Sequence, residues 1–279
     1  MTDTLDASLG EIRALIESLP EWRREDAPAD GSLGLLDGLA AWMGAGQGRC
    51  TPRLERPRAA VFLGRWTEGG DAAATPALEA LRTGTARVGA LCRAYDAELR
   101  VYEMALDAPA GDAAALSQKQ CAAAMAYGMT AVDEGLDLLC LAATGPGVTE
   151  AAAALSKALF ADATPGGDAP FAALARHGGH ALAALAGAVT AARVGGVPVI
   201  LDGFGALAAA AALHRVNESA LDHCVLAQQA SGGAFLALQE RLGKASVIDL
   251  GIAAEDGSAA LLVLGLLRGA LARPDSTPA

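Results

Sequence analysis

Two adjacent carboxylates near the end of the chain are the strongest candidates for chemistry. Glu255 and Asp256 stand immediately before Gly257 and an apolar helical segment. Alanines solvate a carboxylate poorly and so raise its basicity, which predicts a general base that takes a proton from a bound substrate. The alternative is structural, because acidic residues before a helix also favour its dipole. The alanines that flank the pair are Ala253, Ala254, Ala259 and Ala260.

A glycine-rich segment, Ala142–Thr149, follows an apolar run and opens a helical one. Gly145 and Gly147 let backbone N–H groups point outward, and Thr149 is expected to cap the helix. A helix start with free N–H groups suits a phosphate or a carboxylate. The segment is neither a Walker loop nor a dinucleotide fingerprint, so a plain turn remains the alternative.

A third candidate is Asp202, which with Gly203 ends the apolar run Val197–Leu201. A carboxylate there can bind a ribose hydroxyl or orient a neighbouring loop. It can equally cap the helix expected to start near Gly205, and we favour a structural role.

Histidines at positions 177 and 180 flank two glycines at a spacing that could bind a metal ion. No third ligand with matching spacing accompanies them, so no metal site and no cofactor are predicted.

The elements that must position these residues are short apolar runs that alternate with Ala- and Leu-rich helices. Such runs are typical of a parallel sheet that is covered on both faces. With right-handed crossovers, the sequence predicts a three-layer, doubly wound α/β fold with about six strands, mainly parallel. Ligands bind at the carboxyl ends of such strands, where the candidate loops lie. The runs are Ala59–Leu63, Leu99–Val101, Leu138–Leu141, Val197–Leu201, Cys224–Ala227 and Val247–Leu250.

Two helical patterns precede the first strand, so the chain divides into three parts. Residues 1–50 form a small N-terminal helical segment, residues 51–273 the α/β core domain, and residues 274–279 a disordered tail. Ser32 is the expected N-cap of the second helix.

Composition limits the partners that this chain can have. A formal net charge of −11 and a pI of about 4.8 repel a nucleic-acid backbone, and no run of basic residues opposes that field. No apolar stretch is long and uninterrupted enough for a membrane span. The five cysteines are widely spaced, without a Cys-x-x-Cys pair or a visible signal peptide, which favours reduced thiols in the cytoplasm.

Several segments together resemble the nicotinate-nucleotide:dimethylbenzimidazole phosphoribosyltransferase family. Their order and spacing are alike from about residue 25 to residue 272, and the central block is the most specific. The segments are Gly31–Leu36, Leu39–Met43, Gln47–Gly48, Gly178–Gly187, Val197–Phe204 and Leu250–Ala260.

The resemblance implies an activity and a set of substrates. Members transfer the phosphoribosyl group of nicotinate mononucleotide to dimethylbenzimidazole, which gives α-ribazole phosphate for the lower ligand of cobamides. Members are dimers with a parallel α/β core, and a glutamate removes the proton of the base without a metal. The expected substrate contacts are Gly145, Gly147, Thr149, Gly178, Gly179, Asp202, Gly203 and Gly257.

The sequence departs from the family at several site positions. The catalytic glutamate falls on Asp256, with Glu255 one place earlier, and a second active-site glutamate falls on Ala143. A Gly-Asp-His-Gly loop falls near Gly64–Thr67, where Arg65 and Trp66 stand. A base-contacting glutamine falls near Pro76.

Two classes of function therefore remain, and catalytic activity stays open. The first is a phosphoribosyltransferase that accepts nicotinate mononucleotide and a benzimidazole-like base as a homodimer, or that needs a paralogous partner subunit. The second is a non-catalytic homologue that binds a nucleotide or base, or regulates a related enzyme. An unrelated α/β enzyme with similar Ala-rich segments is a third, weaker interpretation.

Overall fold

The computed structural model of the chain describes residues 8–22, 34–66, 76–106, 115–161, 168–230 and 232–272. The predicted tail at 274–279 and the predicted cap at Ser32 lie outside these residues. No described helix has the length and apolarity that crossing a membrane requires.

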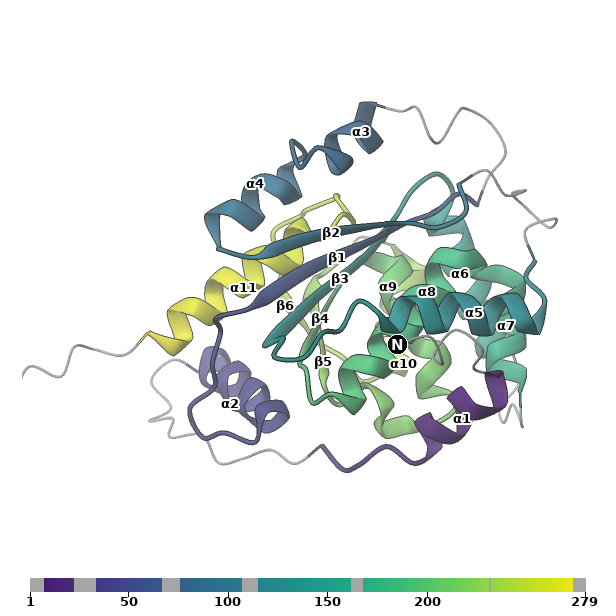
Figure 1. Cartoon of the computed structure of the whole chain (residues 1–279), viewed down its shortest axis with the longest axis horizontal. Coiled ribbons are helices and arrows are strands. Elements are labelled where there is room, and N and C mark those ends of the chain that lie inside the picture. Colours follow the sequence, from purple (N-terminus) through teal and green to yellow (C-terminus); the bar gives the residue numbers. More distant parts are fainter. Residues whose placement is uncertain are drawn as a thin grey trace, which may run out of the picture.

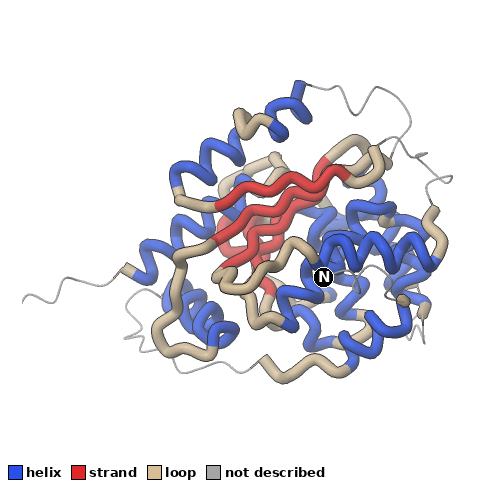
Figure 2. Tube along the Cα trace, in the orientation of Figure 1, coloured by secondary structure: helices blue, strands red, loops and turns tan. Residues whose placement is uncertain are grey.

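Six parallel strands form one sheet in the order β2-β1-β3-β4-β5-β6, which confirms the predicted fold class (Figures 1 and 2). The chain runs from β1 outward to β2 and then returns to β3 on the other side of β1, so the winding direction reverses between β1 and β3. Reversals of this kind open a crevice for ligands at the carboxyl edge. The strands are β1 (Pro57–Leu63), β2 (Glu98–Glu103), β3 (Leu138–Thr144), β4 (Val199–Asp202), β5 (Cys224–Gln228) and β6 (Ser246–Ile248).

The central strands are apolar on both faces because helices cover both. Every residue of β1 is buried, and the side chains at its centre alternate between two core clusters. Ala60 and Phe62 face one cluster, while Ala59 and Val61 face the other, as the two-residue period of a strand requires. The sheet is therefore the middle layer of three.

Helices α2 (Leu35–Gln47), α4 (Arg87–Ala94) and α11 (Ser258–Leu271) cover one face of the sheet (Figure 1). The other face carries a larger group of helices. These are α5 (Gln118–Met129), α6 (Val148–Leu159), α7 (Ala169–His177), α8 (Gly179–Val194), α9 (Gly203–His214) and α10 (Gly233–Arg241).

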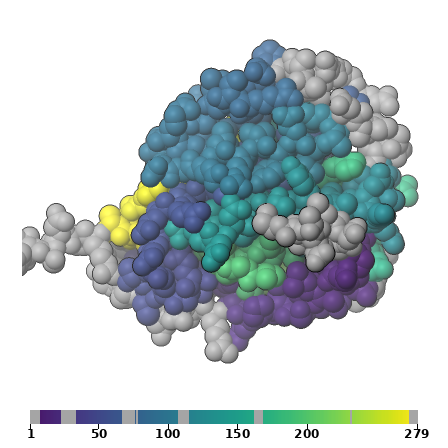
Figure 3. All heavy atoms as spheres, in the orientation of Figure 1, coloured from purple at the N-terminus to yellow at the C-terminus, as the bar shows by residue number. Residues whose placement is uncertain are grey.

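The N-terminal helices pack on this core at two separate places. Helix α1 (Leu9–Glu17) contacts α5, and α2 contacts α11. Arg193 donates to the carbonyl oxygen of Pro20 at 2.6 Å, and Asn217 donates to that of Ile16 at 2.9 Å. Figure 3 shows the purple residues of α1 along the lower border of one face of the molecule. The division of the chain at residue 50 remains a prediction.

Small residues allow α5 and α8 to approach closely. A Cβ on Gly187 of α8 would overlap the carbonyl oxygen of Met125, and one on Gly128 of α5 would overlap that of Ala184. Core packing here depends on backbone contact between helices, in keeping with a sequence that is rich in alanine and poor in aromatic residues.

Gly187→Ala should lower the free energy of unfolding by about 1–3 kcal/mol, because the added methyl group forces α5 and α8 apart. Gly38→Ala is the matched control, because a Cβ on this α2 glycine meets nothing within 4 Å. The control should gain about 0.5–1 kcal/mol from reduced backbone entropy. Denaturant unfolding measures both, and equal effects of the two changes would contradict the packing argument.

Candidate functional site

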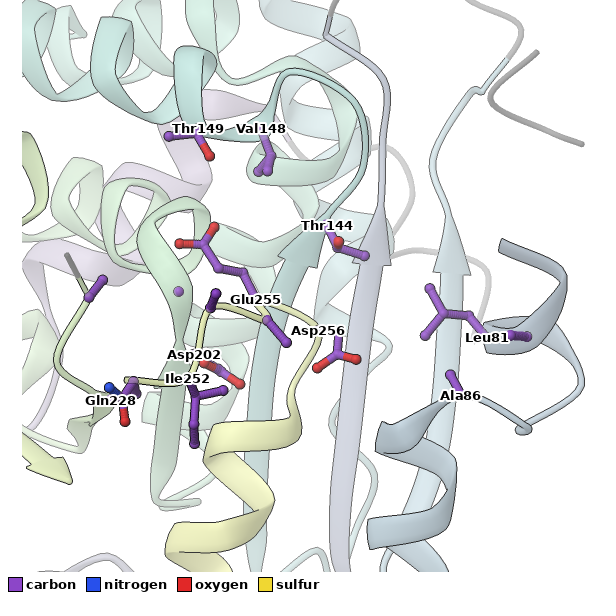
Figure 4. A pocket seen from close by; sticks show the side chains of 15 residues that line it. Leu81, Ala86, Thr144, Val148, Thr149, Asp202, Gln228, Ile252, Glu255 and Asp256 are labelled. Atoms are coloured by element: carbon purple, nitrogen blue, oxygen red, sulfur yellow. The ribbon is translucent and has the colours of Figure 1, made fainter. Parts of the chain in front are cut away.

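A pocket of about 610 Å³ opens at the carboxyl edge of the sheet (Figure 4). It brings together the ends of β3, β4 and β5, the start of α6, and the loop that joins β6 to α11. The short helix α3 (Pro76–Arg82) and the residues before α4 complete its wall. The lining residues are Ala80, Leu81, Ala86, Thr144, Val148, Thr149, Asp202, Gly203, Gln228, Ala230, Ile252, Ala253, Ala254, Glu255 and Asp256.

Asp202, at the end of β4, is 1% exposed. Its Oδ2 atom accepts hydrogen bonds from the backbone N–H groups of Ala259 at 3.0 Å and Ala260 at 3.3 Å. Burial raises the pKa of Asp202 to about 7; the two N–H groups oppose this shift, and the nearby acids Asp256 and Glu255 add to it. Asp202 thus holds the first turn of α11.

Asp202 is the N-cap residue of the helix predicted near Gly205, but its side chain does not cap that helix. That helix, α9, already begins at Gly203, and the Asp202 side chain makes no capping bond to it. Its carboxylate contacts the start of α11 instead, where two backbone N–H groups favour a negative charge.

Glu255 in turn binds the start of α9, the helix that follows Asp202. Its Oε1 atom accepts a hydrogen bond from the backbone N–H of Phe204 at 3.0 Å, in the first turn of α9. A Cβ on Gly203 would lie 2.7 Å from the Cβ of Glu255, so the glycine makes room for this side chain. Gly203 also has a φ of 86°, which favours glycine. Burial raises the pKa of the half-buried Glu255, and the hydrogen bond from Phe204 opposes the shift.

Asp256 is held by a local turn. Its Oδ1 atom accepts a hydrogen bond from the backbone N–H of Ser258 at 3.0 Å, and Gly257, with a φ of 95°, is the N-cap of α11. In Figure 4 the carboxylates of Glu255 and Asp256 point away from each other, that of Glu255 toward Thr149 and Val148. The two acids therefore serve different parts of the pocket.

The start of α6 differs in one respect from the prediction. Gly147, with a φ of 83°, is the N-cap, and Thr149 is the second residue of the helix, so the prediction that Thr149 caps α6 is wrong. Thr149 lines the pocket, and its backbone N–H has no acceptor among the described residues. Gly145 has a φ of 133°, and a Cβ there would overlap the carbonyl oxygen of Gly64.

Gly178 and Gly179 lie against Trp66 and are not part of the pocket lining. The Nε1 atom of Trp66 donates to the carbonyl oxygen of Gly178 at 2.8 Å, and a Cβ on Gly179 would lie 3.2 Å from the same nitrogen. Gly179 therefore makes room for an indole that is 8% exposed, whereas a Cβ on Gly178 would meet Leu174 and Leu182. Their contact with a nucleotide stays a prediction.

Part of the lining is not among the substrate contacts predicted from the sequence. Gln228 is 5% exposed at the end of β5, and its Oε1 atom accepts from the backbone N–H of Leu250 at 3.0 Å. Its position after an apolar run is the same signal that identified Asp202. Leu81 and Ala86, by contrast, carry no such signal, because only the packing of α3 and α4 beside the sheet brings them to the pocket. Among the described residues, no three metal-ligating side chains converge.

The burial of Asp202 predicts a pH dependence of stability. An unfolded aspartate has a pKa of about 3.9, whereas folded Asp202 has a pKa of about 7, so the folded state binds this proton more tightly. The stabilisation that the proton provides is complete below about pH 4 and is lost as the pH rises toward 7.

Asp202→Asn should remove this dependence, because the amide oxygen still accepts from Ala259 and Ala260 but carries no charge. The stability of the variant relative to the unchanged protein should therefore rise between about pH 4 and pH 7 and level off above. Urea unfolding across this range measures the difference. A constant difference would show that Asp202 does not bind a proton in this range.

Comparison with known proteins places this chain in a family. A sequence model of the family described as phosphoribosyltransferase matches residues 13–166 and 160–276. A solved structure from Thermus thermophilus, titled as a nicotinate-nucleotide-dimethylbenzimidazole phosphoribosyltransferase, superposes with a TM-score of 0.70. At 24% identity, over 97% of this chain and 94% of that one, it shows the same fold.

Two curated relatives are named nicotinate-nucleotide–dimethylbenzimidazole phosphoribosyltransferase. The protein of Rhizobium leguminosarum bv. trifolii is 37% identical over 94% of this chain and 89% of its own length. The protein of Methylocella silvestris is 35% identical over 95% of this chain and 93% of its own length. Such identity across nearly the whole of both chains shows that this protein belongs to the nicotinate-nucleotide–dimethylbenzimidazole phosphoribosyltransferase family.

Proposed function

We propose that this protein transfers the phosphoribosyl group of nicotinate mononucleotide to a benzimidazole base, with dimethylbenzimidazole as the first candidate. The observation that carries the proposal is the half-buried Glu255, whose pKa burial raises, in a pocket at the carboxyl edge of the sheet. Membership of the family supplies the reaction. No metal and no cofactor enter the proposal.

The chemistry requires an acceptor for one proton. One nitrogen of the base bonds to the anomeric carbon, the bond to nicotinate breaks, and its electron pair goes to the pyridine nitrogen. The proton on the other nitrogen of the base must then leave, and a carboxylate with a raised pKa takes it.

Glu255 and Asp256 are both candidates for this base, and Glu255 is favoured. Asp256 occupies the position of the family's glutamate, but its side chain is one methylene shorter and turns back to the N–H of Ser258. A displacement of about 1 Å can cost on the order of a hundredfold in rate. Glu255 has the longer side chain, and the space over Gly203 holds it in the pocket.

The remaining groups of the pocket fit the other parts of the substrates. The start of α6, with Gly145, Gly147 and the N–H of Thr149, suits the phosphate. The Oδ1 atom of Asp202 accepts no hydrogen bond from a described residue and suits a ribose hydroxyl, beside Gly203. Leu81, Ala86 and Ile252 offer an apolar wall for the base, and Gly178, Gly179 and Gly257 are kept as backbone contacts.

A non-catalytic nucleotide-binding homologue is the second candidate, and Ala143 is the observation that favours it. Ala143 stands where the family has its second glutamate, and it is fully buried in β3 beneath Gly205. A methyl group there gives no charge to the pocket. In either case we propose a cytoplasmic homodimer or a complex with a paralogous subunit. A purified protein that sediments as a monomer at micromolar concentration would contradict the homodimer.

The deciding experiment incubates the protein with nicotinate mononucleotide and dimethylbenzimidazole and follows nicotinate and α-ribazole phosphate by mass spectrometry. Product would establish the transferase. Nucleotide that raises the melting temperature without being consumed would favour the binding homologue. No product and no stabilisation by nucleotide or base would count against both.

Glu255→Gln should lower kcat by about 10²- to 10⁴-fold, the usual contribution of a general base. Asp256→Asn should cost less than about tenfold, because an amide oxygen preserves the turn with Ser258. Asp249→Asn, an exposed acid on the same loop outside the pocket lining, is the control and should leave kcat unchanged. If the Glu255→Gln, Asp256→Asn double variant turns over normally, neither acid is the base.

A further inference from the structure

A second cavity, of about 310 Å³, lies between α6 and α10. None of its described lining residues lines the site pocket, and on α6 it lies further along the helix than Val148 and Thr149, which do line that pocket. We call it the α6–α10 groove. Its lining residues are Ala153, Ser156, Lys157, Phe160, Ala161, Ala234, Ala237, Leu238 and Arg241.

The groove carries positive charge on a strongly acidic protein. Lys157 and Arg241 line it, none of the described lining residues is acidic, and the whole chain has a formal net charge of −11. Other cations of the described chain, such as Arg58 and Arg82, lie within 4 Å of carboxylates. Neither Lys157 nor Arg241 forms a salt bridge within the described residues. The groove is therefore complementary to an anion.

The aromatic ring of Phe160 orients the guanidinium group of Arg241. The Cζ atoms of Arg241 and Arg215 each lie 5.1 Å from the centre of the Phe160 ring. A cation–π contact limits the orientations of the Arg241 guanidinium, whose planar fork matches a carboxylate.

The alanine-lined surface of the groove fits a ligand with a flat, apolar ring system. Ala153, Ala234 and Ala237 are small, and Leu238 is buried between the helices. A volume of about 310 Å³ lies at the lower end of the range for ligand pockets, too small for a dinucleotide and sufficient for one or two fused rings. The ring would lie on the alanines, with its acidic group at Lys157 and Arg241.

We propose that the α6–α10 groove binds a small aromatic carboxylate, with Lys157 and Arg241 as its anion-binding residues. This site is separate from the proposed transfer reaction and does not depend on it. Because the start of α6 lines the site pocket, a ligand that bridges α6 and α10 further along α6 would also restrain that part of the pocket wall.

Isothermal titration of the full chain with 2-naphthoate tests the proposal, with 2-naphthamide as the uncharged probe of the same shape. Naphthoate should bind at least about tenfold more tightly than naphthamide, the equivalent of one charge-assisted contact. The Lys157→Gln, Arg241→Gln double variant should lose at least about tenfold in affinity for the same reason. The control is Lys119→Gln with Arg176→Gln, which removes the same charge from exposed positions outside the groove and should bind as the unchanged protein does.

Ala237→Phe supplies an independent variant, because it fills the groove from an exposed helix position and leaves both cations in place. It should also abolish naphthoate binding. Binding that persists in the double variant and in Ala237→Phe would place the ligand elsewhere and overturn the proposal. A dimer that dissociates in the double variant, with no binding of naphthoate to the unchanged protein, would also overturn it and show that a second copy covers the groove.

Discussion

The candidate site depends on two carboxylates, each of which binds the start of the helix that follows the other. Asp202 ends β4 and holds the start of α11, while Glu255 precedes α11 and holds the start of α9, the helix that follows β4. Each acid thereby satisfies backbone N–H groups that the other segment leaves open. Because hydrogen bonds tie β4 and the β6–α11 loop in both directions, the pocket between them keeps its shape.

This pair of contacts places the carboxylate of Asp202 in the interior, where its negative charge is poorly solvated. Asp202 is almost fully buried and has two acidic neighbours, so its pKa rises to about 7 although two N–H groups favour its charged form. Burial outweighs the helix starts at this position. The proposed reaction requires a raised pKa of Glu255 as well, and burial raises it.

Close packing of small residues positions the helices and loops that carry these two carboxylates. The helices on the α9 side of the sheet approach through glycine and alanine, as Gly187 against Met125 and Gly128 against Ala184 show. Gly203 follows the same rule at the pocket, because only the missing Cβ leaves room for Glu255. Ala143 extends this packing to β3, because a Cβ on Gly205 would lie 3.2 Å from the Cβ of Ala143.

The sequence by itself determined the strands and the loops that carry chemistry, whereas only the tertiary structure decided which groups these residues contact. Burial on both faces requires apolar runs such as Ala59–Leu63, and the residues just after such runs lie at one edge of a parallel sheet. Asp202 was found in this way, and Gln228 was detectable by the same rule. The hydrogen-bond partner of Asp202 was not detectable, because Ala259 lies 57 residues away along the chain and no local pattern predicts that hydrogen bond. Local sequence fixes the period of burial and the place of a loop, whereas long-range partners follow from how the helices pack on the sheet.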